Sequence, residues 1–379
     1  MTNSSTDALP PQIDPAEWLS LTQSTDRQAI QAAILSENPT ETELALMLAP
    51  AASEFLELMA RRAQSITRRH FGKTIQLYTP LYLSNFCPGG CLYCGIAADR
   101  KAERSVLSLA QVEEEIAAIE KMHLDEVVLL TGERTPEADL PYLRDSIALA
   151  AKHLDNINIE VFPMAEEEYR LLAQAGCTGV TLYQETYDPV AYEKMHRWGP
   201  KRDYAARLDA PERALRGGMR AIGIGALLGL ADPRADMLAL YRHARHLLKT
   251  YWQASVSISF PRIQAQLGGF EPPFPVNHHM LSQFVFAMRI ALPEIPLVLS
   301  TREPAFIRDG LAGIGISKMS VASKTTVGGY TDESTPSTEQ FKISDDRDIP
   351  AFCAMLRSKN LEPVFKNWDT TYREPTSYK

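Results

Sequence analysis

Residues 80–95 read PLYLSNFCPGGCLYCG. The first part of this stretch is a short apolar run, which is typical of a buried β-strand. The second part carries Cys87, Cys91 and Cys94 with the spacing C-x3-C-x2-C. Its glycines let the chain wrap tightly, with backbone N–H groups directed at sulfur. We therefore predict a strand that ends in one tight loop bearing three thiols.

Apolar runs and amphipathic stretches alternate along the rest of the chain. Seven further runs predict strands: EVVLLTGE from Glu126, NINIEVFP from Asn156, GVTLYQET from Gly179, RAIGIGALLGL from Arg220, VSISFPR from Val256, PLVLSTRE from Pro296 and ISKMSVASK from Ile316. Helical stretches such as SLAQVEEEIAAIEKM lie between them, which indicates a parallel sheet covered on both faces.

Eight such units between Pro80 and Lys324 span 245 residues, close to the ~250 residues usual for a (β/α)8 barrel. We therefore predict an α/β fold, a (β/α)8 TIM-type barrel over residues 79–324. An open doubly wound sheet is the alternative. The first strand lacks the G-x-G-x-x-G turn of a dinucleotide-binding fold, which weakens that alternative.

Two shorter segments flank the predicted barrel. Residues 1–78 are predicted to form an N-terminal helical segment packed on the barrel. In this segment Thr40 and Glu43 have capping-box spacing, and Pro50 separates two helices. Residues 325–379 are predicted to form a short C-terminal closing segment with one helix.

Composition and charge exclude several classes of protein. The formal net charge is −8, so no basic surplus is available to neutralise the phosphates of a nucleic acid. No run reaches the ~18 apolar residues of a membrane span. The first residues are polar and lack the apolar core of a secretory signal. We expect a cytoplasmic protein without nucleic-acid or membrane partners.

The five cysteines indicate a metal or cluster site. An odd number with three inside eight residues is a poor disulfide framework, whereas C-x3-C-x2-C is typical of a metal or cluster ligand set in a reducing compartment. Four thiolates would close a [4Fe–4S] cluster; three leave one iron open, as a catalytic centre requires. A zinc knuckle with a distant ligand such as His123 is the alternative. His278 and His279 are assigned to a surface loop, and the isolated Cys177 and Cys353 are predicted to be small buried hydrophobes.

Polar side chains stand at the ends of several predicted strands, where burial without a role is costly. They are Glu133, Glu160, Gln184, Glu185, Arg262 and Arg302. The C-terminal strand ends of a (β/α)8 barrel form its active-site face. We therefore expect these side chains to share a pocket with the cysteine loop.

The cysteine spacing, with Tyr93 before the last cysteine, resembles the signature of radical S-adenosylmethionine (SAM) enzymes. The resemblance implies a [4Fe–4S] cluster held by Cys87, Cys91 and Cys94, whose open iron binds the amino and carboxylate groups of the cofactor's methionine. Thr131, Gly132 and Glu133 are similar to the family's second-strand motif, which holds the methionine amine. RAIGIGALLGL is similar to the fifth-strand segment that lies along the adenine.

The order of further motifs resembles that of tyrosine lyases, the 2-iminoacetate synthases of thiazole (thiamine) biosynthesis. PLYLSN, TGE, VTLYQETY, ALLGL, SFPR, LSTRE, ASKT…GGY, QF…DDR and PVFKNWD all occur in that order. The maturation tyrosine lyases of [FeFe]-hydrogenase are similar in the barrel, but the cysteines after Cys94 cannot build their second cluster. Ile96 departs from the aromatic residue that many relatives have there.

This resemblance implies Cα–Cβ cleavage of L-tyrosine to 2-iminoacetate (dehydroglycine) and p-cresol, with 5′-deoxyadenosine and methionine formed. It implies Arg302 as the partner of the substrate carboxylate. Arg262 is the alternative partner, for the carboxylate of the substrate or of the cofactor, and Ser259 is a candidate contact for a polar group of the substrate. Residues expected to line the pocket around the cofactor are Tyr82, Tyr93, Glu160, Gln184, Glu185 and Arg207. Expected partners are a thiazole synthase and an electron donor such as flavodoxin or ferredoxin. The alternatives are a radical SAM lyase for tryptophan or another amino acid, and a non-enzymatic iron–sulfur carrier.

Overall fold

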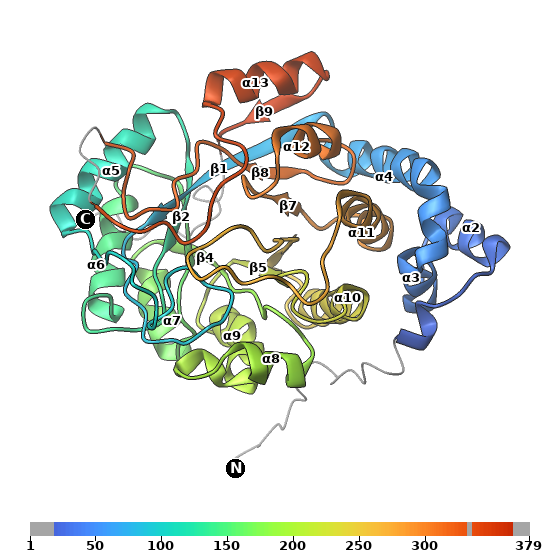
Figure 1. Ribbon diagram of the computed structural model, residues 1–379. Coiled ribbons are helices and arrows are strands. Elements are labelled where there is room, and N and C mark those ends of the chain that lie inside the picture. The colour runs from blue at the N-terminus through green and yellow to red at the C-terminus, as the bar shows by residue number, and fades with distance from the viewer. Residues whose placement is uncertain (1–18, 332–335, 367–379) are drawn as a thin grey trace, which may run out of the picture.

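Eight parallel strands close into a barrel in the computed structural model of the protein, which describes residues 19–331 and 336–366 (Figure 1). The strands are β1 (Thr74–Tyr82), β2 (Glu126–Leu130), β3 (Asn156–Glu160), β4 (Cys177–Thr181), β5 (Ala221–Gly225), β6 (Ser255–Ser259), β7 (Leu297–Leu299) and β8 (Lys318–Ser320). Strand β1 pairs with β8 on one side and with β2 on the other, so the ring is closed. The predicted (β/α)8 barrel is confirmed, and the open-sheet alternative is wrong.

The first strand begins earlier than predicted. We expected it from Pro80, whereas β1 starts at Thr74. Along β1, Gln76 and Tyr78 face the barrel interior, while Ile75 and Leu77 are fully buried on the outer side. This alternation hid the strand from a search for continuous apolar runs.

Helices form the outer layer of the barrel. They are α5 (Leu109–Lys121), α6 (Leu140–Ala150), α7 (Glu166–Gln174), α8 (Pro189–Met195), α9 (Tyr204–Arg216), α10 (Pro233–Thr250), α11 (His278–Ala291) and α12 (Ala305–Leu311). Helix α8 and the 3-10 turn η2 (Pro200–Arg202) are additional elements between β4 and α9. Helix α5 starts at a capping box between Ser108 and Gln111, which satisfies its first free N–H groups.

The N-terminal segment forms α2 (Arg27–Leu35), α3 (Glu41–Leu48), the 3-10 helix η1 (Pro50–Phe55) and α4 (Leu56–Phe71). Elements α3, η1 and α4 pack against the barrel helix α11, α3 also packs against α10, and α2 packs on the other three (Figure 1). The capping box of Thr40 and Glu43 and the break at Pro50 are confirmed. The division at residues 78 and 324 stays a prediction, and the polar residues before position 19 lie outside the described residues.

The C-terminal part of the chain runs across the mouth of the barrel before it forms α13 (Ile349–Ser358) and β9 (Glu362–Val364). The Gln340 N–H donates to the Thr325 carbonyl at 3.0 Å, and the Ser344 N–H donates to the Thr301 carbonyl at 2.9 Å. We did not predict β9, which pairs with the first residues of β1. This crossing segment places side chains over the C-terminal strand ends.

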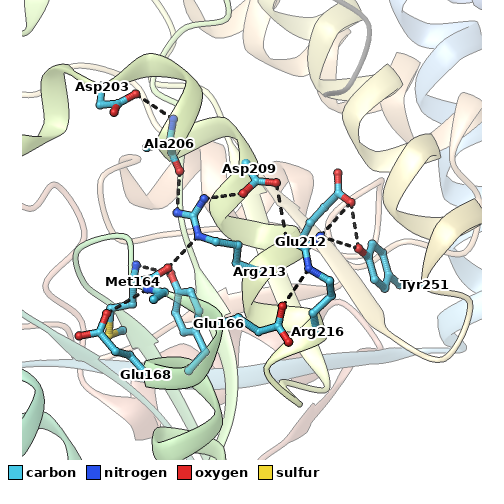
Figure 2. Close-up of polar contacts among 12 residues, drawn as sticks. Met164, Glu166, Glu168, Asp203, Ala206, Asp209, Glu212, Arg213, Arg216 and Tyr251 are labelled. Carbon is cyan, nitrogen blue, oxygen red and sulfur yellow. Dashed lines mark hydrogen bonds and ion pairs between the residues drawn. The ribbon is translucent and has the colours of Figure 1, made fainter. Parts of the chain in front are cut away.

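Figure 2 shows the polar contacts that fix helix α9, which carries Arg207. The Arg213 guanidinium donates to the Met164 carbonyl at 2.8 Å, and Arg216 pairs with Glu166 of α7 at 3.2 Å. These contacts tie α9 to the neighbouring β3–α7 unit. These contacts hold the helix that carries Arg207, and the Arg207 guanidinium itself donates to the Tyr183 carbonyl at 2.8 Å.

Two remaining expectations concern isolated cysteines and membranes. Cys177 and Cys353 are both buried, as predicted. Within the described ranges, none of the helices combines the length and apolarity needed to cross a bilayer.

Candidate active site

Two cavities meet at the C-terminal ends of the strands. The cysteine cavity has a volume of about 100 Å³ and is lined by Cys87, Cys91, Cys94, Tyr93, Ile96, Thr131, Gly132, Glu133, Glu185, Lys201, Arg207 and Gln340. The barrel cavity has a volume of about 260 Å³ and is lined by side chains that include Tyr78, Ser259, Phe260, Ser300 and Ser320. The residues that line both are Tyr82, Leu130, Glu160, Tyr183, Pro261, Arg302 and Phe341. Ligands in the two cavities would therefore meet at this shared wall.

The cysteine loop is held by the segment that follows α8. The Gly90 N–H donates to the Trp198 carbonyl at 3.0 Å. A Cβ atom on Gly90 would lie 2.3 Å from the Trp198 ring, so only glycine allows this approach. The Tyr93 hydroxyl lies 2.7 Å from His196 Nε2. His196 Nδ1 donates to the Tyr192 carbonyl, which leaves Nε2 as the acceptor for Tyr93.

Cys91 is buried, and Cys87 and Cys94 are partly exposed to the cavity. Burial raises the pKa of the Cys87 thiol and raises that of Cys91 to about 12. These two thiols therefore stay protonated until a metal displaces the protons. In residues 19–331 and 336–366, no three His, Cys, Asp or Glu side chains form a site for a single metal ion. A [4Fe–4S] cluster makes a different demand, because each thiolate binds its own iron.

The residues after β2 fit a cluster and a cationic amine beside it. The Glu133 N–H points at Cys87 Sγ at 3.4 Å. A Cβ atom on Gly132 would lie 2.7 Å from the Cys87 Cβ, so the backbone packs directly on the cysteine loop. Glu133 Oε1 lies 3.4 Å from the Arg207 guanidinium, whereas Oε2 is buried without a hydrogen-bond partner. A buried carboxylate oxygen without a donor fits the amine that the family's second-strand motif holds.

Further charged side chains line the cysteine cavity around Glu185. Lys201 Nζ lies 2.5 Å from Glu185 Oε1, and the Arg207 guanidinium lies 3.7 Å from the same oxygen. These cations lower the pKa of Glu185 although burial opposes the charge. Burial, together with Lys201, lowers the pKa of His196 to about 3, so this imidazole is neutral at physiological pH.

A buried carboxylate fixes the turn that carries Glu185. Glu185 has a φ of 72°, which is uncommon for a residue other than glycine. Asp236 Oδ1 accepts from the Tyr187 N–H at 2.7 Å and from the Thr186 hydroxyl at 3.0 Å. Burial raises the pKa of Asp236 to about 7. The turn after Glu185 is therefore held by the side chain of Asp236, which is 1% exposed.

The shared wall contains one carboxylic acid, Glu160, and one arginine, Arg302. Burial raises the pKa of Glu160 to about 7, although the nearby Arg302 favours its ionised form. The Arg302 guanidinium stacks on the Phe341 ring, 3.3 Å from its centroid. No hydrogen bond or ion pair of the Arg302 side chain occurs in the part of the chain that the structure describes. Arg302 can therefore offer its N–H fork to a ligand.

Arg262 is placed differently. Its guanidinium donates to Glu303 Oε1 at 2.9 Å and to the Val276 carbonyl at 2.8 Å, and it lies 3.1 Å from His278 Nδ1. Arg262 lines neither cavity. His278 and His279 are the first two residues of α11, so the expectation that they lie in a surface loop is wrong.

The structure brings most of the predicted site residues to the two cavities. The exceptions are Arg262 and Gln184, which line neither cavity. The Gln184 amide donates to the Tyr204 carbonyl at 3.4 Å. The sequence analysis missed Lys201 and His196, for which no local pattern gave a signal. It also missed Gln340 and Phe341 as site residues, although it noted the QF pair among the ordered motifs.

A (β/α)8 barrel with three cysteines after its first strand and a glutamate after its second defines a class of enzyme. The family model of the Radical SAM superfamily matches residues 81–244, and the model of the Biotin and Thiamin Synthesis associated domain matches residues 259–362. These enzymes use a [4Fe–4S] cluster and SAM.

Individual relatives narrow this class. The 2-iminoacetate synthase of Escherichia coli (strain K12) is 40% identical over 342 residues, which cover 90% of each chain. The 2-iminoacetate synthase of Salmonella typhimurium (strain LT2) is 38% identical over 344 residues, again 90% of each chain. The chain belongs to the 2-iminoacetate synthase family. The X-ray structure of the FeFe-hydrogenase maturase HydG from Carboxydothermus hydrogenoformans matches with a TM-score of 0.84 and 30% identity, over 96% of this chain and 88% of that one.

Proposed function

We propose that the protein is a radical SAM lyase that cleaves L-tyrosine between Cα and Cβ. The products are 2-iminoacetate and p-cresol, formed together with 5′-deoxyadenosine and methionine. The observation that carries the proposal is the Arg302 guanidinium, which lines both cavities, stacks on Phe341 and has no hydrogen bond or ion pair within the described chain. This fork suits the carboxylate of an amino acid bound next to the cofactor.

Cys87, Cys91 and Cys94 are proposed to hold a [4Fe–4S] cluster with one iron left open. Glu133 is proposed to accept a hydrogen bond from the methionine amine of SAM, because its Oε2 has no other donor. Tyr93, Thr131, Gly132, Glu185 and Arg207 would line the rest of the cofactor site. When bound, SAM and the cluster supply a radical that removes a hydrogen atom from the substrate amine.

The substrate is proposed to lie across the shared wall. Arg302 would bind the carboxylate, and Glu160 would stand near the amine. A pKa of about 7 lets Glu160 change its charge when a cation binds beside it. The aromatic ring would extend into the barrel cavity, where Ser259 and Tyr183 offer polar groups.

Two predicted site residues receive positioning roles in this proposal. Arg262 would fix Glu303 at the end of β7, directly after Arg302 in sequence. Gln184 would support α9 through its contact with Tyr204, the first residue of that helix. Both act through a neighbour and neither lines a cavity.

The product and the cofactors imply partners. 2-Iminoacetate hydrolyses readily, so we propose hand-off to a thiazole synthase and electron supply by a flavodoxin or ferredoxin. We place the reaction in the cytoplasm, because free thiols and thiolate cluster ligands need a reducing compartment.

The experiment uses the full chain under anaerobic conditions. The protein is reconstituted with iron and sulfide and then mixed with SAM, a strong reductant and tyrosine. Mass spectrometry follows 5′-deoxyadenosine, p-cresol and glyoxylate, the hydrolysis product of 2-iminoacetate. We expect all three to rise together, and a Cys91→Ala variant to make none.

Other outcomes separate the alternatives. Deoxyadenosine without p-cresol would keep the radical assignment and reject tyrosine, and tryptophan would be tested next. An intact cluster spectrum with no deoxyadenosine would support an iron–sulfur carrier. Phenylalanine is the matched substrate control, because a site that bonds a hydroxyl rejects the analogue without it.

A further inference from the structure

Gln340 lies between the cysteine loop and the barrel mouth, on the segment that crosses the strand ends. Its side-chain Nε2 lies 3.8 Å from Cys94 Sγ, within hydrogen-bonding distance for sulfur. Its backbone N–H is bonded to the Thr325 carbonyl. A Cβ atom on Gly95 would lie 2.4 Å from the Gln340 carbonyl oxygen, so the cysteine loop packs against this backbone. The position of Gln340 is thus fixed from both sides.

A second contact sets the orientation of the Gln340 amide. The Tyr82 hydroxyl donates to Gln340 Oε1 at 2.6 Å. A carboxamide that accepts through oxygen turns its N–H2 group to the other side, which here is the side of Cys94. Tyr82 is on β1 and lines both cavities. A hydrogen-bonded chain therefore runs from the shared wall through Gln340 to a cysteine sulfur.

The sulfurs of Cys87 and Cys91 have neighbours of a different kind. Cys87 Sγ receives the Glu133 backbone N–H at 3.4 Å. Cys91 has the charged Lys201 nearby, which favours its thiolate although burial opposes it. Cys94 is the sulfur that receives a side-chain N–H among the hydrogen bonds of the described residues. A side-chain donor can be removed by one substitution without changing the loop.

We propose that Gln340 is a positioning residue that acts through Cys94 to raise the reduction potential of the cluster. The inference rests on the proposed function, because it requires a cluster on the three cysteines. Reduction adds one electron and so increases the negative charge on the ligating sulfurs. An N–H donor then stabilises the reduced form more than the oxidised form. The C-terminal segment thereby makes the cluster easier to reduce, and Tyr82 keeps the donor aimed.

The test measures the midpoint potential of the reconstituted cluster by a redox titration followed by electron paramagnetic resonance, without SAM. Gln340→Ala is expected to lower the ratio of reduced to oxidised cluster at a fixed potential by about tenfold. For a one-electron couple this corresponds to a midpoint potential that is lower by about 59 mV. Gln340→Glu keeps the shape, removes the donor and adds charge, so it is expected to shift the midpoint further in the same direction. Tyr82→Phe, which frees the amide, is expected to give a smaller shift of the same sign.

Gln264 supplies the matched control. It also lines the cysteine cavity, and its amide oxygen accepts from the Ser344 hydroxyl at 3.5 Å. Among the hydrogen bonds of the described residues, none joins Gln264 to a cysteine sulfur. Gln264→Ala is expected to keep the wild-type midpoint. Wild-type midpoints in both Gln340 variants, with full iron content and an unchanged absorption spectrum, would overturn the inference. Failure of the wild-type chain to assemble any cluster would instead overturn the proposed function.

Discussion

Replacing Arg302 by methionine removes the charge and keeps the length of the side chain. The guanidinium is half-buried at the wall shared by the two cavities, is stacked on Phe341, and has no hydrogen bond to the rest of the described chain. Its loss breaks no hydrogen bond, but it removes a cation that favours the ionised form of Glu160. Because Glu160 is proposed to stand near the amine, which tyrosine and tyramine share, comparing the two ligands separates the carboxylate contact from this effect.

The magnitude follows from the geometry of the fork. A carboxylate takes two N–H donors from one guanidinium, and a hydrogen bond to a charged group contributes about 1.5–3 kcal/mol. The cavity admits water, so the lower value is appropriate, and two bonds give about 3 kcal/mol. That corresponds to about a 100-fold loss in affinity for tyrosine. Arg302→Lys keeps the charge without the fork, and we expect about a tenfold loss.

The assay is equilibrium binding of tyrosine and of tyramine, which lacks the carboxylate, to the reconstituted enzyme with SAM. The wild type should prefer tyrosine by about the same 100-fold, and Arg302→Met should bind the two ligands nearly equally. Comparing two proteins with two ligands isolates the interaction between the guanidinium and the carboxylate, because only wild type with tyrosine has both groups. Arg220, which lines the barrel cavity at the N-terminal ends of the strands, provides the control variant Arg220→Met. It should change neither affinity by more than about twofold.

One result would refute the reasoning. If Arg302→Met weakened tyrosine and tyramine by equal factors, the guanidinium would not contact the carboxylate. Its role would then be to shape the wall through Phe341, and the substrate would lie elsewhere in the cavity.

Three further predictions concern the cofactor site and the barrel wall. Gly132→Ala places a Cβ atom 2.7 Å from the Cys87 Cβ and should lower the iron content after reconstitution severalfold. The control Gly310→Ala adds a Cβ atom in open space and should keep the wild-type iron content. Equal iron content in the two variants would contradict the packing argument. Glu133→Gln should weaken SAM binding to the reconstituted protein by about tenfold, because it removes a charge-assisted hydrogen bond; wild-type affinity in equilibrium dialysis would exclude Glu133 as the amine partner. The native pKa of Asp236, raised to about 7, makes the native state bind more protons than the unfolded state between pH 4 and 7. The free energy of unfolding of the wild type should therefore fall by about 3 kcal/mol from pH 5 to pH 8, relative to Asp236→Asn. Parallel denaturant curves for the two proteins across that range would disprove this.

The local signals in the chain determined much of the fold and of the cofactor site. Apolar runs separated by amphipathic helices predicted the barrel, because parallel strands buried on both faces need apolar residues on both sides. The three cysteines predicted a cluster-binding loop, because ligand spacing within one loop is a local property of the sequence. The resemblance at Thr131–Glu133 predicted further residues beside it, and the structure places both groups in one cavity. The capping box at Thr40 was equally local.

The tertiary structure alone decided which distant side chains serve the site. Arg262 and Arg302 both end predicted strands, and only the packing revealed that Glu303 saturates the first and leaves the second free. Lys201 lines the cysteine cavity from a segment with no motif of its own, and the QF motif that contains Gln340 gave no sign of its contact with Cys94. The sequence predicted β1 too short, from Pro80 instead of Thr74. The first half of this strand alternates polar and apolar side chains because the barrel interior is polar, and no single strand reveals that interior. Contacts between residues far apart in sequence depend on how the whole ring closes, so the sequence pattern around each residue carries no record of them.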